Sequence, residues 1–223
     1  MDGKKRSTYE RILDAAEKLF AEQGYEGTST REIVKAANAS LSSFHLLFRS
    51  KENLCHEVLS RVMERHRQML LPVFTRACHL HEQGLLRGEA AWDIWAETVR
   101  TYVDWAFLPT NRHAILLLAR DMLDINSKIK TPPYALELTD MIQMVCRDYT
   151  GDPDARWARP IGLLLLNTVF TFVNYPVTMT KMLGSDILAS ENVSETREQV
   201  SRYLLLTLRA WLDDHKKAVQ DLL

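Results

Sequence analysis

The sequence has few of the residues that build disulfide-rich or membrane proteins. It contains only three cysteines, Cys55, Cys78 and Cys146, whose odd number and wide spacing fit neither a disulfide framework nor a paired-cysteine metal site. Its longest apolar run, residues 161–173, is 13 residues long, whereas a membrane-spanning helix needs about 20. The basic N-terminus also lacks the apolar core of a signal peptide. These absences predict a soluble, cytoplasmic protein that does not enter a membrane.

Glycine and proline are also scarce, and no stretch alternates apolar and polar residues as a strand does. The 223 residues include 8 glycines and 7 prolines, and 46% hydrophobic with 26% charged residues is ordinary for a globular chain. Apolar residues instead recur at helical spacing almost throughout, which predicts an all-α fold. A net charge of -1 argues against a polyanion binder that uses its whole surface. Residues 1–51 nevertheless carry nine basic and seven acidic side chains, which leaves room for a local basic face.

Three short helices followed by a longer one are predicted near the N-terminus. We expect the short helices over about residues 8–23, 30–37 and 41–48, and the long one from residue 51. Serine caps are expected before the four helices at Ser7, Ser29, Ser40 and Ser50. Glu10 and Glu32 complete the first two caps as capping boxes. Asn38, which tolerates the left-handed conformation, breaks the chain sharply between the second and third helices. This succession is typical of a helix-turn-helix.

The stretch from Arg11 to Leu54 resembles the N-terminal domain of the TetR family of bacterial transcriptional regulators. The matching positions are Ile12-Leu13, Ala15-Ala16, Leu19-Phe20, Gly24-Tyr25, Thr28, Thr30, Ile33, Ala37, Ser40, Phe48 and Ser50-Lys51-Glu52. The resemblance implies a helix-turn-helix DNA-binding domain over residues 1–54 and a larger helical effector-binding and dimerisation domain over residues 55–223. It also implies a repressor, not an enzyme, that binds palindromic double-stranded operator DNA as a homodimer and is released by a small-molecule effector.

Phe44 and Phe48 are expected to face the core, so the opposite side of the third helix is free to enter a major groove. The candidate DNA-binding residues are Thr28, Thr30, Arg31, Ser42, Ser43, His45, Leu46 and Lys51. The two threonines lie at a helix N-terminus, where hydroxyls and amides favour a phosphate. Arg31 has the reach for a phosphate or a guanine edge. The family resemblance assigns Lys51 to the phosphate backbone.

The predicted reading helix departs from the usual pattern of the family. Ser42, Ser43, Phe44 and His45 stand where a glycine, a small residue and Leu-Tyr are common, so His45 replaces a tyrosine that typically touches the DNA backbone. Leu46 either contacts a thymine methyl group or packs against the fourth helix, and the sequence leaves both open. The operator sequence therefore cannot be carried over from a relative.

The C-terminal part offers candidates for a dimer interface and for an effector pocket. Residues 161–166 are apolar all round, and the last helix carries Tyr203, Leu204, Leu205 and Leu208 on several faces, which favours a four-helix interface or, alternatively, two internal core helices. The pocket candidates are Trp105, Met122, Met144, Phe170 and Tyr175, with Trp92, Trp95, Tyr102 and Met141 weighed beside them. They suggest an apolar or aromatic effector, although such a stripe is also typical of plain core.

Two other clusters carry chemically active residue types. Cys78, His79, His81 and Glu82 contain metal-ligand types, but neighbours at this spacing do not converge as two histidines at i and i+4 would. Asp121 and Asp124 with His113 suggest hydrolytic chemistry, but no GxSxG nucleophile motif accompanies them, and helix salt bridges are the favoured interpretation. No metal or cofactor is therefore predicted. An all-helical enzyme or metal protein, and a protein-interaction module without an operator, remain the alternative hypotheses.

Overall fold

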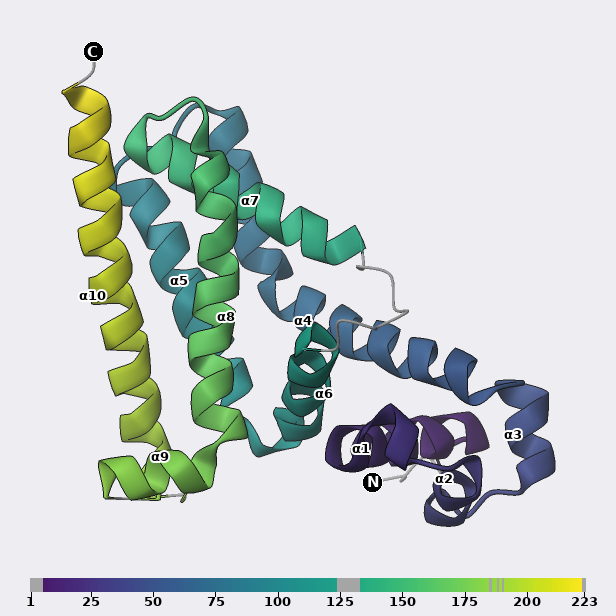
Figure 1. The fold of residues 1–223 in the computed structure, drawn as a ribbon. Coiled ribbons are helices and arrows are strands. Elements are labelled where there is room, and N and C mark those ends of the chain that lie inside the picture. The colour runs from purple at the N-terminus through teal and green to yellow at the C-terminus, as the bar shows by residue number, and fades with distance from the viewer. Residues whose placement is uncertain (1–5, 124–132, 185, 188, 190, 222–223) are drawn as a thin grey trace, which may run out of the picture. The chain divides into compact units, whose positions relative to one another are not determined.

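The computed structural model describes residues 6–123, 133–184, 186–187, 189 and 191–221, leaving aside the side chains of residues 120–136, 163 and 166. Its described part consists of helices and contains no strand (Figure 1), which confirms the all-α prediction. The α-helices are α1 (Thr8–Gly27), α2 (Thr30–Ala36), α3 (Leu41–Leu47), α4 (Lys51–Glu82), α5 (Glu89–Ala106), α6 (Arg112–Leu123), α7 (Pro133–Thr150), α8 (Arg159–Asn174), α9 (Pro176–Leu183) and α10 (Val193–Gln220). Two 3-10 helices, η1 (Pro109–Asn111) and η2 (Ala155–Ala158), lie between them.

The chain forms two compact units. The first comprises residues 1–65 and 110–130, and the second comprises residues 66–109 and 131–223. The long helix α4 contributes its first half to one unit and its second half to the other. The functional boundary predicted after residue 54 stays a prediction.

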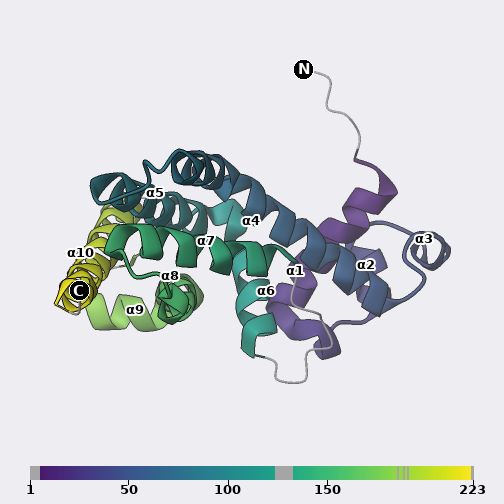
Figure 2. The same ribbon diagram turned by 90° about the horizontal axis from the view of Figure 1, so that it is seen from above.

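The first unit is a small helical domain built on α1. Buried Ile12, Ala16 and Phe20 on one face of α1 meet Phe44 of α3 and Leu54 of α4 in a common core. Helix α6, although distant in sequence, packs beside α1 (Figure 2) and adds a leucine to the same core. Burial of these apolar faces, more than the propensity of such short helices, stabilises α2 and α3.

The predicted helix starts of this unit are confirmed. Ser7 with Glu10 and Ser29 with Glu32 form complete capping boxes before α1 and α2. The Ser40 hydroxyl accepts the Ser43 amide at 3.0 Å before α3, and the Ser50 hydroxyl accepts the Asn53 amide at 3.1 Å before α4. The predicted first helix ends near residue 23. In the structure Gly24 adopts φ 81° and interrupts the helix there, and the helix then continues to Gly27. Each cap fixes where its helix begins, because it satisfies amides that the helix itself leaves without partners.

The second unit packs α5, α7, α8 and α10 around one core. Its centre includes the fully buried Trp95 and Ile94 of α5, together with Val145 of α7, Val169 of α8 and Leu212 of α10. The segment after Asp152-Pro153 is divided into η2, α8 and α9, with an 84° bend between residues 155–174 and 176–183. The bend follows from proline chemistry, since Pro176 lacks the amide that would continue α8 and suits the first turn of α9.

No single helix in the described ranges has the length and hydropathy to cross a membrane. The bent pair over residues 155–174 and 176–183 meets that criterion only when its two parts are taken together.

Candidate functional site

Helix α3 presents one face to the core and another to solvent. Phe44 is fully buried, and Phe48, which follows the helix, is 3% exposed and stacks on the Tyr9 ring with centroids 5.0 Å apart. On the opposite side His45 is exposed and Leu46 is 83% exposed. Of the two interpretations that the sequence left open for Leu46, the structure therefore supports a solvent-facing side chain rather than packing against α4.

The serines of α3 differ in their surroundings. Ser42 is exposed, whereas Ser43 is half-buried and its hydroxyl lies 2.9 Å from the Ser40 hydroxyl. The Ser43 amide is also used by the Ser40 cap. Ser42 therefore lies with His45 and Leu46 on the exposed part of the predicted reading face, and Ser43 lies at its edge.

The turn before α3 is held from α1. Asn38 adopts φ 47°, as its predicted left-handed role requires. The Arg11 guanidinium donates to the Ala37 carbonyl at 3.0 Å and to the Asn38 carbonyl at 3.3 Å. Arg11 thereby satisfies two carbonyls that the tight turn would otherwise leave to water. It fixes the angle at which α3 leaves α2.

The N-terminus of α2 carries three of the predicted DNA-binding residues. Thr28 is 1% exposed and its hydroxyl donates to the Gly24 carbonyl at 2.8 Å, so this hydroxyl faces inward. Thr30 is half-buried and Arg31 is exposed, with their amides in the first turn, where a helix offers them no internal acceptor. Hydrogen bonds from the Ser29 hydroxyl and amide hold the pKa of Glu32 below its usual value.

Lys51 has a structural contact that its position in the sequence does not reveal. Its ammonium donates to the Tyr25 carbonyl at 2.9 Å and to the Thr28 carbonyl at 3.2 Å, and it lies 4.1 Å from the centre of the Tyr25 ring. An ammonium has three donors, so one remains for a phosphate oxygen. Lys51 is thus placed beside the α2 N-terminus, joining the end of α1 to the start of α4.

Arg49 is a basic residue of this surface that the sequence analysis did not select. It is exposed, directly follows α3, and adopts φ 67°, which is uncommon for a residue with a side chain. Its carbonyl lies 3.3 Å from Nδ1 of His45. When Nδ1 donates to this carbonyl, the other ring nitrogen of His45 is left to face solvent. The sequence does contain a signal for Arg49, because a basic residue immediately follows the predicted reading helix.

The second unit has a small, partly open apolar cavity of about 30 Å³ between α4, α5, α7, α8 and α10. Among its lining residues are His66, Trp95, Tyr102, Ile142 and Gly162. Trp95 and Tyr102 are among the pocket candidates named from the sequence, whereas His66, Ile142 and Gly162 are not. A lone histidine on an apolar helix face gives no distinctive sequence pattern.

The predicted ligand-binding residues do not lie together around this cavity. Trp105 is buried with its ring edge-on to His66, at a centroid distance of 5.1 Å. Phe170 is buried and Met144 half-buried, but neither lines the cavity, and Tyr175 is 56% exposed. The side chain of Met122 lies outside the described residues. Trp105, a member of the predicted set, therefore packs against a residue of the cavity wall.

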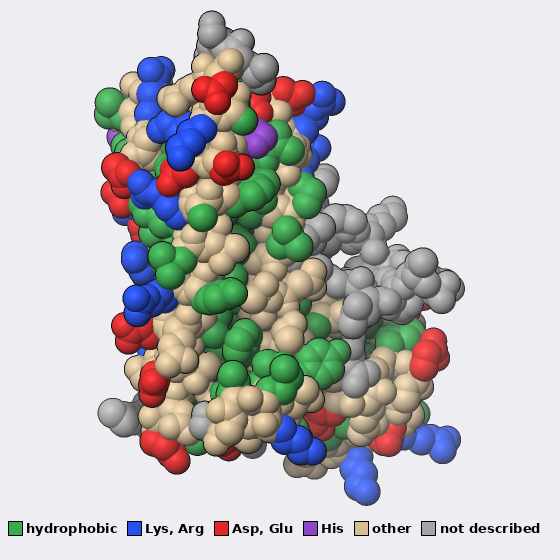
Figure 3. Space-filling view, turned by 60° about the vertical axis from the view of Figure 1, so that its left-hand side comes forward, with side chains coloured by type: hydrophobic (Ala, Val, Ile, Leu, Met, Phe, Trp, Pro, Cys, Tyr) green, Lys and Arg blue, Asp and Glu red, His purple; other side chains and the backbone are tan. Residues whose placement is uncertain are grey.

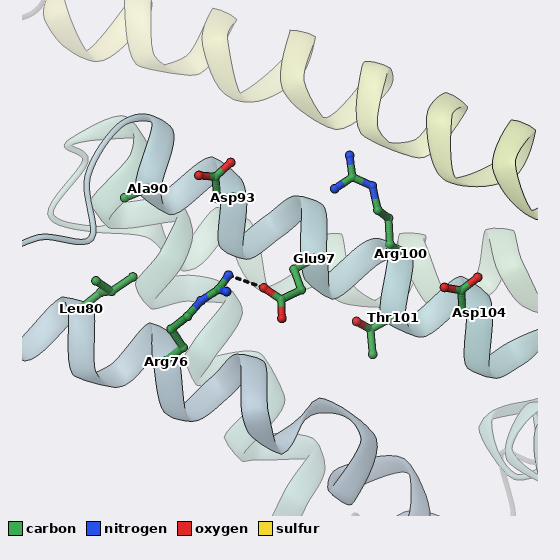
Figure 4. A pocket seen from close by; sticks show the side chains of 8 residues that line it. All are labelled: Arg76, Leu80, Ala90, Asp93, Glu97, Arg100, Thr101 and Asp104. Atoms are coloured by element: carbon green, nitrogen blue, oxygen red, sulfur yellow. Dashed lines mark ion pairs between the residues drawn. The ribbon is translucent and has the colours of Figure 1, made fainter.

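A second hollow is an open groove on the outside of α4 and α5, with a volume of about 510 Å³ (Figure 4). Charged side chains dominate it, and an ion pair between Arg76 and Glu97 crosses it from one helix to the other. Asp93, Glu97, Arg100 and Asp104 follow one another at helical spacing along α5. This pattern is that of a solvated helix face.

The two chemically active clusters from the sequence analysis have ordinary partners. His81 bonds to Asp148 through Nδ1, and Nε2 of His113 lies 3.4 Å from the Glu22 carboxylate, while Asp121 and Asp124 lie outside the described side chains. No group of three or more His, Cys, Asp or Glu side chains in the described part of the chain is arranged to hold a metal ion.

Comparison with known proteins agrees with this geometry. Residues 12–58 match the family model described as bacterial regulatory proteins, tetR family. The matched range covers α1 to α3 and the start of α4, which includes the whole exposed surface described above.

The similar curated proteins are HTH-type transcriptional regulators. YvkB of Bacillus subtilis (strain 168) is 41% identical over 56 residues, which are 25% of this chain and 30% of that protein, so the match spans less than a third of that relative. YvdT of the same organism is 27% identical over 173 residues, covering 74% of this chain and 81% of its own. Both are uncharacterized.

Similarity to solved structures extends over nearly the whole chain and concerns the fold. A bacterial regulatory protein of the tetR family from Rhodococcus RHA1 aligns with a TM-score of 0.58 and 20% identity, covering 92% of this chain and 97% of that one. The Rhodococcus protein and the two curated relatives are named as regulators, in agreement with the prediction of a non-enzymatic protein. The helix-turn-helix of this chain, over residues 12–58, therefore matches that of the tetR family of bacterial regulatory proteins, and the fold of nearly the whole chain is similar to that of a solved member.

Proposed function

We propose that the protein is a cytoplasmic transcriptional repressor that binds palindromic operator DNA as a homodimer and is released by a small-molecule effector. The observation that carries the proposal is the exposed face of α3. A buried phenylalanine anchors this short helix to a rigid core, while His45 and the 83% exposed Leu46 project from its other side. A helix held in this way fits a major groove about 12 Å wide.

The charges around α3 support contact with a phosphate backbone. Arg31 of α2 and Arg49, which follows α3, are exposed, and Lys51 stands at the α2 N-terminus with one donor to spare. The acidic side chains Asp14 and Glu17 of the same unit are neutralised by ion pairs with Arg61 at 2.7 Å each. Basic residues around the reading helix thus remain available for phosphate oxygens.

Exposed apolar side chains on the second unit support a homodimer. Leu164 of α8 is 65% exposed, and Tyr203 and Leu206 of α10 are 72% and 62% exposed. Figure 3 views the side on which α10 lies and shows hydrophobic side chains along it. The other interface candidates named from the sequence are buried within the unit: Leu204, Leu205 and Leu208. A large contiguous apolar patch marks an interaction surface, and a dimer with two-fold symmetry suits a palindromic operator whose half-sites lie about 34–36 Å apart.

The dimer proposal has a direct test. Analytical ultracentrifugation should find a dimer for the wild-type chain and a monomer for Leu206→Glu, because a carboxylate at the interface would be desolvated without a partner. Leu85, 58% exposed in the loop after α4, provides the matched control. Leu85→Glu should remain dimeric. A wild-type monomer would exclude this arrangement.

DNA binding is tested by incubating the full chain with a fragment library of bacterial genomic DNA at several salt concentrations and sequencing what is retained. We expect one palindromic sequence to be enriched, with an affinity that falls steeply as salt rises. Lys51→Ala should weaken binding to all fragments and lower the slope of log affinity against log salt by about 1.

The matched control for Lys51 is Lys18, an exposed residue of α1. Lys18→Ala removes the same charge from the same unit and should leave the salt slope unchanged. Retention without sequence preference, in the wild-type chain, would contradict the proposed function.

A further inference from the structure

The reading helix α3 lacks the side chains that most often read bases. None of its seven residues, all of which the structure describes, is an arginine, lysine, asparagine, glutamine, aspartate or glutamate. Those residue types make the hydrogen bonds by which the edges of guanine, adenine and cytosine are ordinarily read in a major groove. The sequence selectivity of α3 therefore depends on another kind of contact.

Leu46 is the most exposed leucine of this helix. It is 83% exposed, against 39% for Leu41 and 40% for Leu47. Successive residues of an α-helix are about 100° apart, so Leu46 lies about 160° around the helix from the fully buried Phe44. Ser42, four residues before Leu46, shares its side of the helix. Leu46 and Ser42 thus lie opposite the contact that α3 makes with the core.

The side chain of Leu46 has no hydrogen-bonding group, which limits what it can contact favourably in a groove. Against an amino, carbonyl or ring-nitrogen edge it would remove water from that group without replacing the hydrogen bond, at a cost in free energy. Thymine alone among the four bases presents a methyl group, on C5, in the major groove. Contact between this methyl group and a leucine removes apolar surface of both from water. Leu46 therefore favours thymine over the other three bases.

The polar side chains beside Leu46 are less selective. A serine hydroxyl both donates and accepts, so Ser42 accommodates either kind of base edge. Ser43 is half-buried, and its hydroxyl lies within hydrogen-bond distance of another serine at 2.9 Å. Nδ1 of His45 lies 3.3 Å from the Arg49 carbonyl, which leaves this ring one nitrogen for a base or a phosphate. The methyl contact is thus the most selective contact that α3 offers.

We infer that Leu46 reads a C5-methyl group, so that each half-site of the operator contains one thymine whose methyl group the protein requires. The inference rests on the proposed function, because it needs α3 to lie in a major groove. It also has a consequence for modified DNA. 5-Methylcytosine carries its methyl group on the same ring atom as thymine, so methylation of a cytosine at this position strengthens binding. The affinity of the protein for such a site then depends on the methylation of the DNA.

The test uses the full chain and the operator duplex enriched in the library selection. Deoxyuridine replaces each thymidine in turn, at the symmetry-related positions of both half-sites, and the affinity is measured by gel shift at a fixed salt concentration. Uracil differs from thymine only by the absent methyl group. At one position of the half-site the substitution should weaken binding about fourfold for each half-site, hence about 15-fold for both, as expected for burial of one methyl-sized group.

Two variants assign this loss to Leu46. Leu46→Ala removes most of the apolar side chain, and Leu46→Asn keeps its approximate size but replaces the methyl groups with an amide. Each should bind the thymidine and deoxyuridine operators with affinities within about twofold of each other, because the apolar partner of the methyl group is gone. The matched control is Leu85→Ala, at an exposed leucine of the second unit, which should keep the full loss. Because Leu46 is exposed, neither variant should disturb folding.

A second pair of duplexes tests the consequence for methylated DNA. At the position found by the deoxyuridine scan, a C·G pair replaces the T·A pair, and the cytosine is either unmodified or methylated on C5. The wild-type chain should bind the methylated duplex about fourfold more tightly for each half-site. Leu46→Ala should bind the two duplexes equally.

The outcomes separate this inference from the proposed function. If no deoxyuridine substitution weakens binding, or if each weakens the wild-type and Leu46→Ala chains alike, the inference is refuted, since a loss common to both comes from the shape of the DNA. Equal affinity of the wild-type chain for the cytosine and 5-methylcytosine duplexes also refutes it. A chain that enriches an operator and gives either result leaves the proposed function standing. A chain that enriches no sequence refutes the proposed function and the inference together.

Discussion

Protonation of His66 should make the stability of the second unit depend on pH. Burial lowers its pKa from 6.5 to about 4. Between these values the unfolded chain binds a proton that the folded chain does not, so the free energy of unfolding rises with pH in this range. The contribution of His66 is therefore complete above about pH 6.5 and is lost as the pH falls to about 4.

The size of the effect follows from the difference between the two pKa values. A difference of about 2.5 units corresponds to about 3 kcal/mol, and about 2 kcal/mol of this should already be lost at about pH 5. A loss of this size is a large part of the stability of an ordinary domain, which is roughly 5–15 kcal/mol. It is also larger than the change expected from a single exposed histidine.

Urea unfolding of the wild-type chain and of His66→Phe, at several values between about pH 8 and pH 5, isolates this contribution. Acidic groups contribute equally to both chains, so the wild-type should lose about 2 kcal/mol more than the variant. His56, an exposed residue of α4, is the matched control, and His56→Gln should behave as the wild-type does. Parallel losses in wild-type and His66→Phe would refute the reasoning, as would an NMR titration of His66 with a midpoint near 6.5.

Three further predictions concern the first unit. Glu17 is 6% exposed and forms ion pairs with two arginines of α4 at 2.7 and 2.6 Å. Glu17→Gln should therefore lower the free energy of unfolding by about 2 kcal/mol in urea titrations. A change no larger than that of Glu26→Gln on the surface would count against the ion pairs. Arg11→Ala should weaken operator binding in a gel-shift assay although Arg11 bonds to the protein's own turn, and unchanged affinity would argue against this support of α3. Ser43→Ala and His45→Ala should each alter the preferred sequence in the library selection, whereas an unchanged preference in both would contradict the assigned reading face.

Local features of the fold could be predicted from the sequence because each depends on residues a few positions apart. A capping box joins a serine to a glutamate three residues later, and Ser29 with Glu32 forms it as expected. Asn38 adopts the left-handed conformation that its residue type tolerates. The positions of Phe44 and Phe48 at i and i+4 fix the inner side of α3 and hence its outer side.

Features that depend on distant residues could not be predicted in this way. Lys51 bonds to carbonyls 23 and 26 residues earlier, and carbonyl acceptors leave no trace in the sequence, because every residue has one. The packing of α6 against α1 joins segments far apart in the chain. The cavity beside His66 likewise depends on the packing of five helices, and the sequence shows only that each of them is apolar on one side.

The orientation of α3 is determined by residues outside α3. Seven residues make a helix too short to be stable alone, so its direction must come from its neighbours. Arg11 holds the turn before it, Tyr9 stacks on Phe48 after it, and Lys51 ties the following helix to the end of α1. The first two contacts connect the reading helix and its turn to α1, and the third joins α1 to α4. The residues that decide which DNA is read therefore differ from those that decide whether any DNA is read, and substitutions in the two groups should separate specificity from affinity.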